Sequence, residues 1–441
     1  MKRSCIVFLV TLILSSCSFQ GSKSWEKVTE NPDYIHRAVK EVTEVMLHDI
    51  YSPPVASRIY AYVSVAGYEA ALHGDKHYLS LAGQLHGLDH IPQPDPNKKY
   101  SFSLAAAHAI LLVGKTLVTS EGRIEDFHSK LMEEFKAAGM PDEVFENSTA
   151  YGKLVADRIL AWAAKDKYKQ TRSLSRYDVL SDEASWKPTP PAYMKAVEPH
   201  WNQLRPFLID SAQQFKPLPA IAFSAKPASP FYHLALAVHD AGKHLSPEQE
   251  AIANFWDCNP FKVNTNGHIM YATKKISPGG HWINITRLAC KKVHADYVRT
   301  AEAYAYLSMV IADGFISCWD EKYRSRVIRP ETYINQYIDQ NWMPLLQTPP
   351  FPEYTSGHSV ISTASAVMLA KLFSDHFSFT DSTEVEFGLP VRRFKSFKAA
   401  SDEASISRFY GGIHYMPSIT NGIDEGEKIG YFALQKLKTR K

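Results

Sequence analysis

The sequence predicts an all-α protein, a large helical bundle with one proline-rich extended segment. Apolar residues recur at helical spacing through most of the chain beyond residue 31. Strand-like alternation of apolar and polar residues is nearly absent. A length of 441 residues, 45% of them hydrophobic, is ample for a large buried core. We therefore expect residues 32–441 to form a single helical domain.

The expected helices are stretches in which apolar residues return every three or four positions. They span residues 34–48, 55–72, 102–118, 124–138, 148–164, 231–244, 248–256, 282–319, 360–373, 391–407 and 425–437. Some of their boundaries carry stop and start signals. Gly139 with Pro141 separates two of these helices, and Gly242 with Ser246 and Pro247 separates two others.

Residues 165–230 break this pattern. They hold many of the prolines and show little periodicity. A linker between domains would also be proline-rich, but this segment contains Trp186, Tyr193 and Trp201 among several apolar residues. We expect an ordered extended segment that wraps one helical body.

The N-terminus has the pattern of a targeting segment. Lys2 and Arg3 precede the apolar residues 6–14, and small residues directly precede Cys17. The tetrapeptide LSSC that ends at Cys17 resembles a bacterial lipobox. That resemblance implies diacylation of Cys17. The alternative is an ordinary secretory signal in which this cysteine is incidental.

The lipoprotein interpretation divides the chain into three parts. Residues 1–16 would be the signal peptide, residues 17–31 a polar tether, and residues 32–441 the catalytic domain. No later apolar run reaches the ~18 residues that a membrane helix needs. We therefore expect an exported protein with a lipid anchor in a membrane, at the outer membrane or the periplasmic face.

Charge and cysteine usage narrow the function further. The net charge of +3 is too mild to indicate a nucleic-acid partner, so any important cations must be clustered locally. Cys258, Cys290 and Cys318 would remain in the exported body, an odd number from which one disulfide could form. The sequence has no CxxC spacing and no zinc pattern.

The first of three chemical motifs is KYRSRVIRP, at residues 322–330. Lys322 and Arg329 are seven residues apart, close to two helical turns, so both side chains can point to one side. Pro330 disfavours helical geometry at Arg329, which places the guanidinium at a helix end, where it can grip two oxygens of an anion. Taken alone, the stretch is more simply a solvated basic face.

The second motif is YTSGH, at residues 354–358, just before an apolar helix. Ser356 is a good N-cap residue. The free N–H groups of Gly357 and His358 would then face outward at the positive end of the helix dipole, where anions bind. An ordinary capped helix would have the same sequence.

The third motif is SRFYGGIH, at residues 407–414. On a continuous helix, Arg408 and His414 would diverge by well over 100°. Gly411 and Gly412 break the helix, so the chain can turn and bring His414 back to the side of Arg408. A surface histidine after a glycine turn is the simpler interpretation of this motif alone.

The combination of the three motifs is far more specific than any one of them. In this order, K-x6-R-P, S-G-H and S-R-x3-G-x-H resemble the signatures of the vanadium haloperoxidase and type 2 phosphatidic acid phosphatase superfamily. The motifs, together with Trp319 and Asp320 just before them, lie within residues 318–414. The resemblance implies an α-helical bundle that binds vanadate or transfers phosphoryl groups at one pocket.

The resemblance also implies roles for individual residues. The equatorial oxygens of the oxyanion would be neutralised by the three cations, with hydrogen bonds from the serine and glycine of the second motif: Lys322, Arg329, Arg408, Ser356 and Gly357. His414 would be the axial group, as the vanadium ligand in a haloperoxidase or the phosphohistidine nucleophile in a phosphatase. His358 would be the acid–base residue on the opposite side. An imidazole supplies the neutral axial nitrogen that such an oxyanion needs.

The wider sequence resembles secreted vanadium haloperoxidases and their bacterial relatives more than lipid phosphatases. Trp319 and Phe351 resemble residues that shape the chloride-oxidising pocket, and Asp257 stands where it could orient His358. Two positions depart from the family pattern. Thr355 replaces a usual proline, which would loosen the loop before the serine. Ser418 replaces an aspartate that orients the axial imidazole in many members.

Three functions are compatible with these residues. The leading one is a vanadate-dependent haloperoxidase that oxidises halide with hydrogen peroxide, with proton transfer through His358 and activation of the peroxide by Lys322. The alternative is an acid phosphatase that needs no cofactor and hydrolyses a phosphate ester through His414. A non-catalytic oxyanion-binding lipoprotein is a third, although a pure binder would need only the cations.

Overall fold

The computed structural model describes residues 25–266 and 268–441. The expected signal peptide and Cys17 lie outside the described residues. Within the segment expected to be a tether, residues 25–29 form the short helix α1 (Trp25–Thr29). Thr29 is buried and Trp25 packs against the core, so these residues belong to the folded body.

Long helices that pack side by side form the centre of the molecule. They are α3 (Pro53–Ala71), α11 (Tyr297–Ser325), α13 (Gly357–Leu372) and α15 (Met416–Lys436). Helix α11 packs against both α3 and α13, and α13 packs against α15. Every residue of α3 is buried, and it begins at the N-cap Ser52, whose side chain accepts a hydrogen bond from Val55 N. The all-α expectation is therefore confirmed.

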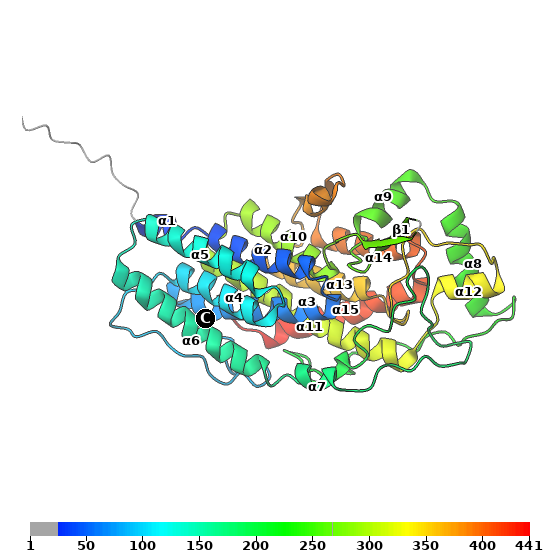
Figure 1. Ribbon diagram of the computed structural model, residues 1–441, viewed down its shortest axis with the longest axis horizontal. Helices are drawn as coiled ribbons and strands as arrows, with labels where there is room; N and C mark the ends of the chain where they lie inside the picture. The colour runs from blue at the N-terminus through cyan, green and yellow to red at the C-terminus, as the bar shows by residue number, and fades with distance from the viewer. Residues whose placement is uncertain (1–24, 267) are drawn as a thin grey trace, which may run out of the picture.

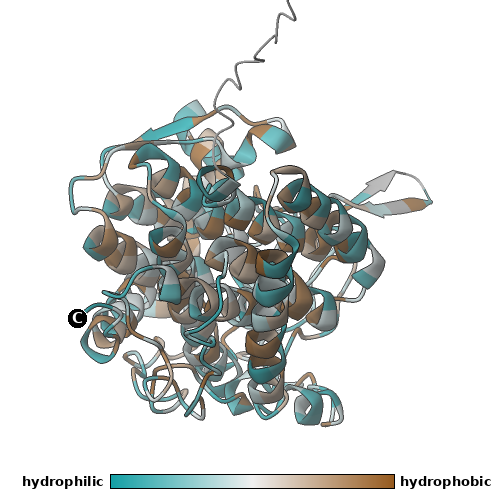
Figure 2. Ribbon diagram, turned by 90° about the vertical axis from the view of Figure 1, so that its left-hand side faces the viewer, coloured by the Kyte–Doolittle hydropathy of each residue, from teal (hydrophilic) through white to brown (hydrophobic). Residues whose placement is uncertain are grey.

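Other helices cover the two ends of this centre (Figure 1). At one end lie α2 (Asp33–His48), α4 (Phe102–Leu117), α5 (Glu121–Ala137) and α6 (Asp142–Ala163), with α10 (Pro278–Lys292) beside them. At the other end lie α8 (Pro230–Lys243), α9 (Pro247–Phe255), α12 (Pro330–Tyr337) and α14 (Phe397–Tyr410). Figure 2 looks along the long axis of the molecule, so many of these helices are seen end-on.

Strands are few and short in the described chain. β1 (Val263–Asn266) pairs antiparallel with β2 (Ile269–Ala272), and β3 (Phe379–Asp381) pairs antiparallel with β4 (Arg392–Phe394). The remaining short elements are η1 (Leu72–Gly74), α7 (Tyr168–Arg172), η2 (Trp201–Gln203) and η3 (Thr383–Phe387).

Several helix boundaries differ from the prediction. The single helix expected over residues 282–319 is two helices, α10 and α11, because His294 has a φ of 50° and Asp296 caps α11 by accepting from Arg299 N at 2.8 Å. Residues 392–394 form strand β4 instead of a helix, and α14 begins only after the N-cap Ser396. Helices α6 and α15 begin earlier than expected, and α12 was not expected.

The extended proline-rich segment is confirmed. Trp186 and Trp201 are buried, and the carboxylate of Asp313 in α11 accepts the backbone N–H groups of residues 207–209 at 2.7, 2.7 and 3.0 Å. Farther along α11, the carbonyl of Val197 accepts from the indole of Trp319 at 3.1 Å. The segment is therefore fixed along the same helix that carries Lys322.

The three cysteines expected in the body are all free and buried: Cys258, Cys290 and Cys318. They form no disulfide with one another. Among the described residues, we find no helix with the length and apolarity required to cross a membrane.

Candidate active site

The structure brings the cations of the first and third motifs together in the interior. Lys322 lies in the last turn of α11, Arg329 is the N-cap residue of α12, and Arg408 lies in the last turn of α14. Their relative exposures are 0%, 0% and 2%. Side chains that are almost never fully buried alone are here buried as a group.

Lys322 is surrounded by backbone oxygens. Its Nζ donates to the carbonyls of Pro352 and Glu353 at 3.1 and 3.0 Å, and also to that of Thr355. Burial lowers the pKa of Lys322 to about 8, and the nearby Arg329 contributes to that lowering. The ammonium group is held in place, but an anion would stabilise its charge further.

Arg329 stands at a helix end, as its position before Pro330 predicts. Its Nε donates to the carbonyl of Phe351 at 2.9 Å, and its Nη1 donates to that of Ile413 at 2.9 Å. The same Nη1 lies 3.1 Å from Nε2 of His414. Burial lowers the pKa of Arg329 to about 10.

Arg408 is the least satisfied of the three. Its Nη1 donates to the carbonyl of Trp256, and it also lies 3.2 Å from Nε2 of His358. Its Nε is buried and has no hydrogen-bond partner among the described residues. A buried guanidinium N–H without an acceptor is costly, and an oxyanion would satisfy it.

The second motif forms a helix N-terminus, as expected. Ser356 is the N-cap of α13, and its Oγ accepts from Ser359 N at 3.3 Å. Helix α13 begins at Gly357, whose N–H is one of the free donors of the first turn. A Cβ added to Gly357 would lie 3.6 Å from Trp319, an ordinary contact, so the glycine leaves open space at the pocket.

The glycine turn after α14 places His414. Gly412 has a φ of +76°, and an added Cβ would lie 3.0 Å from Pro344, so this position requires glycine. The turn brings His414 beside Arg329. Burial, followed by the charges of the surrounding cations, holds the pKa of His414 well below its usual value, so the imidazole is neutral.

A carboxylate that the sequence reasoning missed orients this imidazole. Oε1 of Glu353 accepts from Nδ1 of His414 at 2.8 Å and from Tyr415 N at 3.0 Å. Its Oε2 accepts from the hydroxyl of Ser418 at 2.6 Å. The imidazole of His414 is therefore oriented by a carboxylate even though residue 418 is a serine. Ser418 positions Glu353, and Glu353 supplies that carboxylate. The sequence signal that could have identified this carboxylate is the position of Glu353, directly before the YTSGH motif.

The loop before Ser356 is not loosened by Thr355. The hydroxyl of Thr355 donates to Oε2 of Glu425 at 2.8 Å, and the hydroxyl of Ser317 donates to Oε1 of the same residue at 2.7 Å. Thr355 is fully buried. Burial raises the pKa of Glu425 to about 7. Hydrogen bonds therefore hold the loop where the family usually has a proline.

Asp257 does not orient His358, so that expectation was wrong. The Asp257 carboxylate pairs with Lys275 at 2.7 Å and Lys262 at 3.5 Å. Nε2 of His358 instead donates to the carbonyl of Trp256 at 3.1 Å. A backbone carbonyl can hold an imidazole as a carboxylate does, but the sequence carries no signal for it. Burial, and then Arg408, hold the pKa of His358 well below its usual value.

Trp319 and Phe351 form one wall of the cavity at this site. Their ring centroids are 4.8 Å apart at 50°, and the Phe351 centroid lies 5.2 Å from Nζ of Lys322. The cavity has a volume of about 40 Å³ and is also lined by His358, Arg408 and His414. The two aromatic rings therefore lie where a small substrate would approach the cations.

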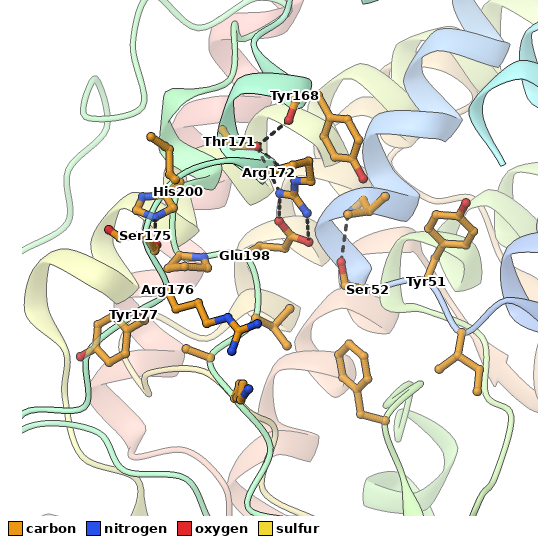
Figure 3. Close-up of a pocket in the computed structure, with 18 of the residues that line it drawn as sticks. Tyr51, Ser52, Tyr168, Thr171, Arg172, Ser175, Arg176, Tyr177, Glu198 and His200 are labelled. Atoms are coloured by element: carbon orange, nitrogen blue, oxygen red, sulfur yellow. Dashed lines mark hydrogen bonds and ion pairs between the residues drawn. The ribbon is translucent and has the colours of Figure 1, made fainter. Parts of the chain in front are cut away.

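A larger cavity of about 860 Å³ shares Phe261 with this small one. Figure 3 shows its lining, in which Arg172 is paired with Glu198 and Arg176 extends into the open space. The two histidines and the buried cations do not line this larger cavity, so it is not the site itself.

The donors of the inner site fit a tetrahedral or trigonal-bipyramidal oxyanion. Arg408, His358 and His414 line the small cavity, and both imidazoles have lowered pKa values. Arg329 is buried beside His414, and Lys322 is buried beside Phe351. The carboxylate of Glu353 accepts from Nδ1 of His414. Unpaired buried charge costs several kcal/mol per ion, so this arrangement favours a bound anion. The orphaned Nε of Arg408 is the donor that such an anion would satisfy.

Comparisons with known proteins agree with this geometry. A family model described as the second helical-bundle domain of VCPO matches residues 336–440. The crystal structure of the first bacterial vanadium-dependent iodoperoxidase is similar over 93% of this chain and 98% of its own, with 49% identity and a TM-score of 0.88. No curated protein sequence matches this chain.

More distant structures share the architecture. The holo-type bacterial vanadium-dependent chloroperoxidase covers 88% of this chain and 92% of its own, with 16% identity and a TM-score of 0.66. Its apo-type structure covers 87% and 94%, with the same identity and TM-score. At that identity the likeness shows the fold alone.

Proposed function

This chain belongs to the vanadium-dependent haloperoxidases, and from that premise we propose that it oxidises iodide with hydrogen peroxide at the pocket between His358 and His414. The observation that carries the proposal is the orientation of His414. Glu353 holds its Nδ1–H at 2.8 Å, which leaves the lone pair of Nε2 directed toward Arg329 and the buried cations. A haloperoxidase needs a neutral nitrogen in that position to hold vanadate.

Vanadate would be held by the groups that converge on the pocket. Nε2 of His414 would be the protein ligand to the metal. The oxygens would be held by the cations and by the N-terminus of α13: Lys322, Arg329, Arg408, Ser356 and Gly357. When bound, vanadate supplies a Lewis-acid centre that makes hydrogen peroxide electrophilic toward a halide.

The residues of the chain control protons and charge around that centre. His358 is neutral because burial and Arg408 lower its pKa, so it can accept the proton of an incoming peroxide. Its Nε2–H remains fixed by the carbonyl of Trp256. Lys322, whose ammonium is held by three carbonyls, would act through its positive charge, which favours the anionic group and the negative charge that develops when the peroxide reacts.

The choice of iodide rests on two observations. The chain is 49% identical to a bacterial iodoperoxidase over nearly its full length. The approach to the pocket is lined by Phe261, Trp319 and Phe351, with Pro349 beside them. An apolar wall costs a weakly hydrated anion such as iodide less desolvation than a strongly hydrated one such as chloride.

The phosphatase alternative uses the same residues but has no observation of its own in its favour. Both kinds of solved neighbour are peroxidases. The non-catalytic binder is also disfavoured, because two oriented imidazoles serve no purpose in simple anion capture.

A matched assay tests the proposal. The body of the protein is prepared without vanadium, then assayed with and without orthovanadate for oxidation of iodide, bromide and chloride, and for hydrolysis of an aryl phosphate. Peroxide-dependent iodide oxidation that appears only with vanadate supports the proposal. Phosphate release that vanadate inhibits, with no halide oxidation, would overturn it.

We also propose that the protein is an exported lipoprotein anchored through Cys17. The LSSC tetrapeptide at residues 14–17 follows a short apolar run and precedes polar residues. Such a location would keep a reactive hypohalous product outside the cytoplasm.

A further inference from the structure

A second cluster of reactive side chains lies behind the active site. Nδ1 of His281 is 3.5 Å from Sγ of Cys258 and 3.1 Å from Oε1 of Glu384. These three atoms all lie within 4.8 Å of one another, and all three residues are buried. Cys258 follows α9, His281 lies in α10 and Glu384 lies in η3, so three segments far apart in sequence meet here.

The spacing of the three atoms matches a tetrahedral metal. Ligands at zinc bond lengths in a tetrahedron would be separated by about 3.6 Å for sulfur and nitrogen, and about 3.3 Å for nitrogen and oxygen. The observed separations are 3.5 and 3.1 Å. A thiolate, an imidazole and a carboxylate are ligands that zinc accepts together.

The other nitrogen of His281 has the partner that a metal-binding histidine usually has. Its Nε2 donates to Oδ2 of Asp381 at 2.8 Å, and both side chains are buried. Oδ1 of Asp381 is in turn held by Thr383, through its N–H at 2.9 Å and its hydroxyl at 2.6 Å. Such a carboxylate fixes the tautomer and leaves Nδ1 free to bind a metal.

Glu384 provides an independent observation. It is 2% exposed, yet its Oε1 has no hydrogen-bond partner among the described residues. The 3.1 Å approach to His281 Nδ1 therefore does not have hydrogen-bond geometry. A buried carboxylate oxygen left without a donor is expensive, and a cation between it and the imidazole would satisfy it.

From this geometry we propose that Cys258, His281 and Glu384 bind a divalent cation of the zinc class. The site adjoins the vanadate pocket, because Cys258 also lines that pocket, but His281 and Glu384 do not. The three ligands come from distant segments, so no zinc pattern is visible in the sequence.

The cation would position the catalytic histidine through Trp256. The Trp256 indole stacks on the His281 ring, with ring centroids 4.4 Å apart and an interplanar angle of 21°. Trp256 is also only two positions before Cys258 in the chain. The Trp256 carbonyl accepts from His358 at 3.1 Å and from Arg408. A metal that ties Cys258 to His281 therefore fixes the carbonyl that holds both groups. It would also protect the thiolate from peroxide.

The test measures metal and not activity. The full chain is purified from zinc-supplemented culture without chelators, and its zinc is measured by mass spectrometry. We expect about one zinc per chain, and at least about tenfold less in Cys258→Ser and Glu384→Gln. Cys290→Ser is the matched control. Cys290 is a buried free cysteine like Cys258, but it lies farther along α10 and outside the cluster. It should retain the zinc.

Cobalt substitution keeps the test decisive if a variant fails to fold. Zinc is removed from the wild-type protein and Co²⁺ is added, and the near-ultraviolet spectrum is recorded. A thiolate-to-cobalt charge-transfer band supports the site. A wild-type protein that holds no zinc and takes up no Co²⁺ would overturn it, and so would bound Co²⁺ without that band. The cluster would then be an imidazolium held by carboxylates. Failure of the vanadate assays would leave this measurement unaffected.

Discussion

The carboxylate of Glu353 lies 2.8 Å from Nδ1 of His414 and 2.6 Å from the hydroxyl of Ser418. In this protein a glutamate from the loop before α13 and a serine after the histidine share the task that the family resemblance assigns to a single aspartate at position 418. The division has a measurable consequence. The orientation of the proposed vanadium ligand depends on two residues that are 65 positions apart.

Glu353→Gln should weaken vanadate binding about 10- to 100-fold, because the amide cannot replace the carboxylate that orients and tunes the imidazole. Ser418→Ala should have a smaller effect in the same direction. The measurement is the vanadate concentration that restores half of the activity. Glu69→Gln is the matched control, since Glu69 of α3 is an equally buried carboxylate, held by Ser80 and by the backbone N–H of Leu81. Unchanged vanadate affinity in Glu353→Gln would contradict the assigned role.

His414→Ala should abolish halide oxidation and any phosphatase activity, because no other imidazole lies beside Arg329 among the described residues. Rate measurements at saturating vanadate and peroxide provide the check. Full activity in this variant would remove His414 from the mechanism.

Arg408→Ala should weaken oxyanion affinity by at least about tenfold. The negative charge of the oxyanion is balanced by three cations in the wild type and would be balanced by only two in this variant. Titration calorimetry with orthovanadate measures the loss. Arg324→Ala is the control, as Arg324 comes from the same basic stretch as Lys322 but forms an ion pair with Glu321. Equal affinities in the two variants would contradict the assignment of Arg408.

Vanadate affinity should fall as the pH rises through about 8. Burial lowers the pKa of Lys322 to about 8 from its usual 10.5, so the side chain is charged below this pH and loses its charge above it. An anion binds the charged form, so the dissociation constant should rise by up to about tenfold per pH unit above 8. The same titration on Lys322→Met should lack this contribution. Protonation of the anion itself changes the affinity of both proteins in the same way. If wild type and Lys322→Met showed the same pH dependence of vanadate affinity, the role of Lys322 would be contradicted.

Cys17→Ser should release the protein from the membrane fraction, because a serine cannot carry the thioether-linked lipid. Fractionation of cells and labelling with a radioactive fatty acid measure the change. Cys5→Ser lies in the same segment and serves as the control. If Cys17→Ser remained in the membrane fraction with undiminished label, the lipoprotein proposal would fail.

The sequence predicted the fold class and most helices well, because burial of one helix face produces a repeating apolar pattern. It failed where a local cap overrides that pattern. Apolar residues continue through residues 282–319, yet Asp296 caps a new helix by accepting from Arg299 N. Residues 392–394 likewise pair as a strand with Phe379–Asp381 despite a helical pattern.

The residues of the site that belong to the three motifs were predictable from the sequence. Cations, histidines and the N-cap serine occur at fixed spacings within short segments, so their sequence positions imply their geometry. Glu353, the Trp256 carbonyl and the cluster around His281 are different. They act through contacts between segments that are 61 to 102 residues apart, and nothing in local spacing encodes such a contact.

Two of the three cations of the pocket, Lys322 and Arg329, are held by main-chain oxygens of one short loop. Lys322 donates to the carbonyls of Pro352 and Glu353, and Arg329 donates to those of Phe351 and Pro352. Ordering these long side chains costs rotamer entropy, and that cost is met when the polypeptide folds. These two side chains are therefore already ordered before vanadate binds, so their ordering does not reduce its affinity.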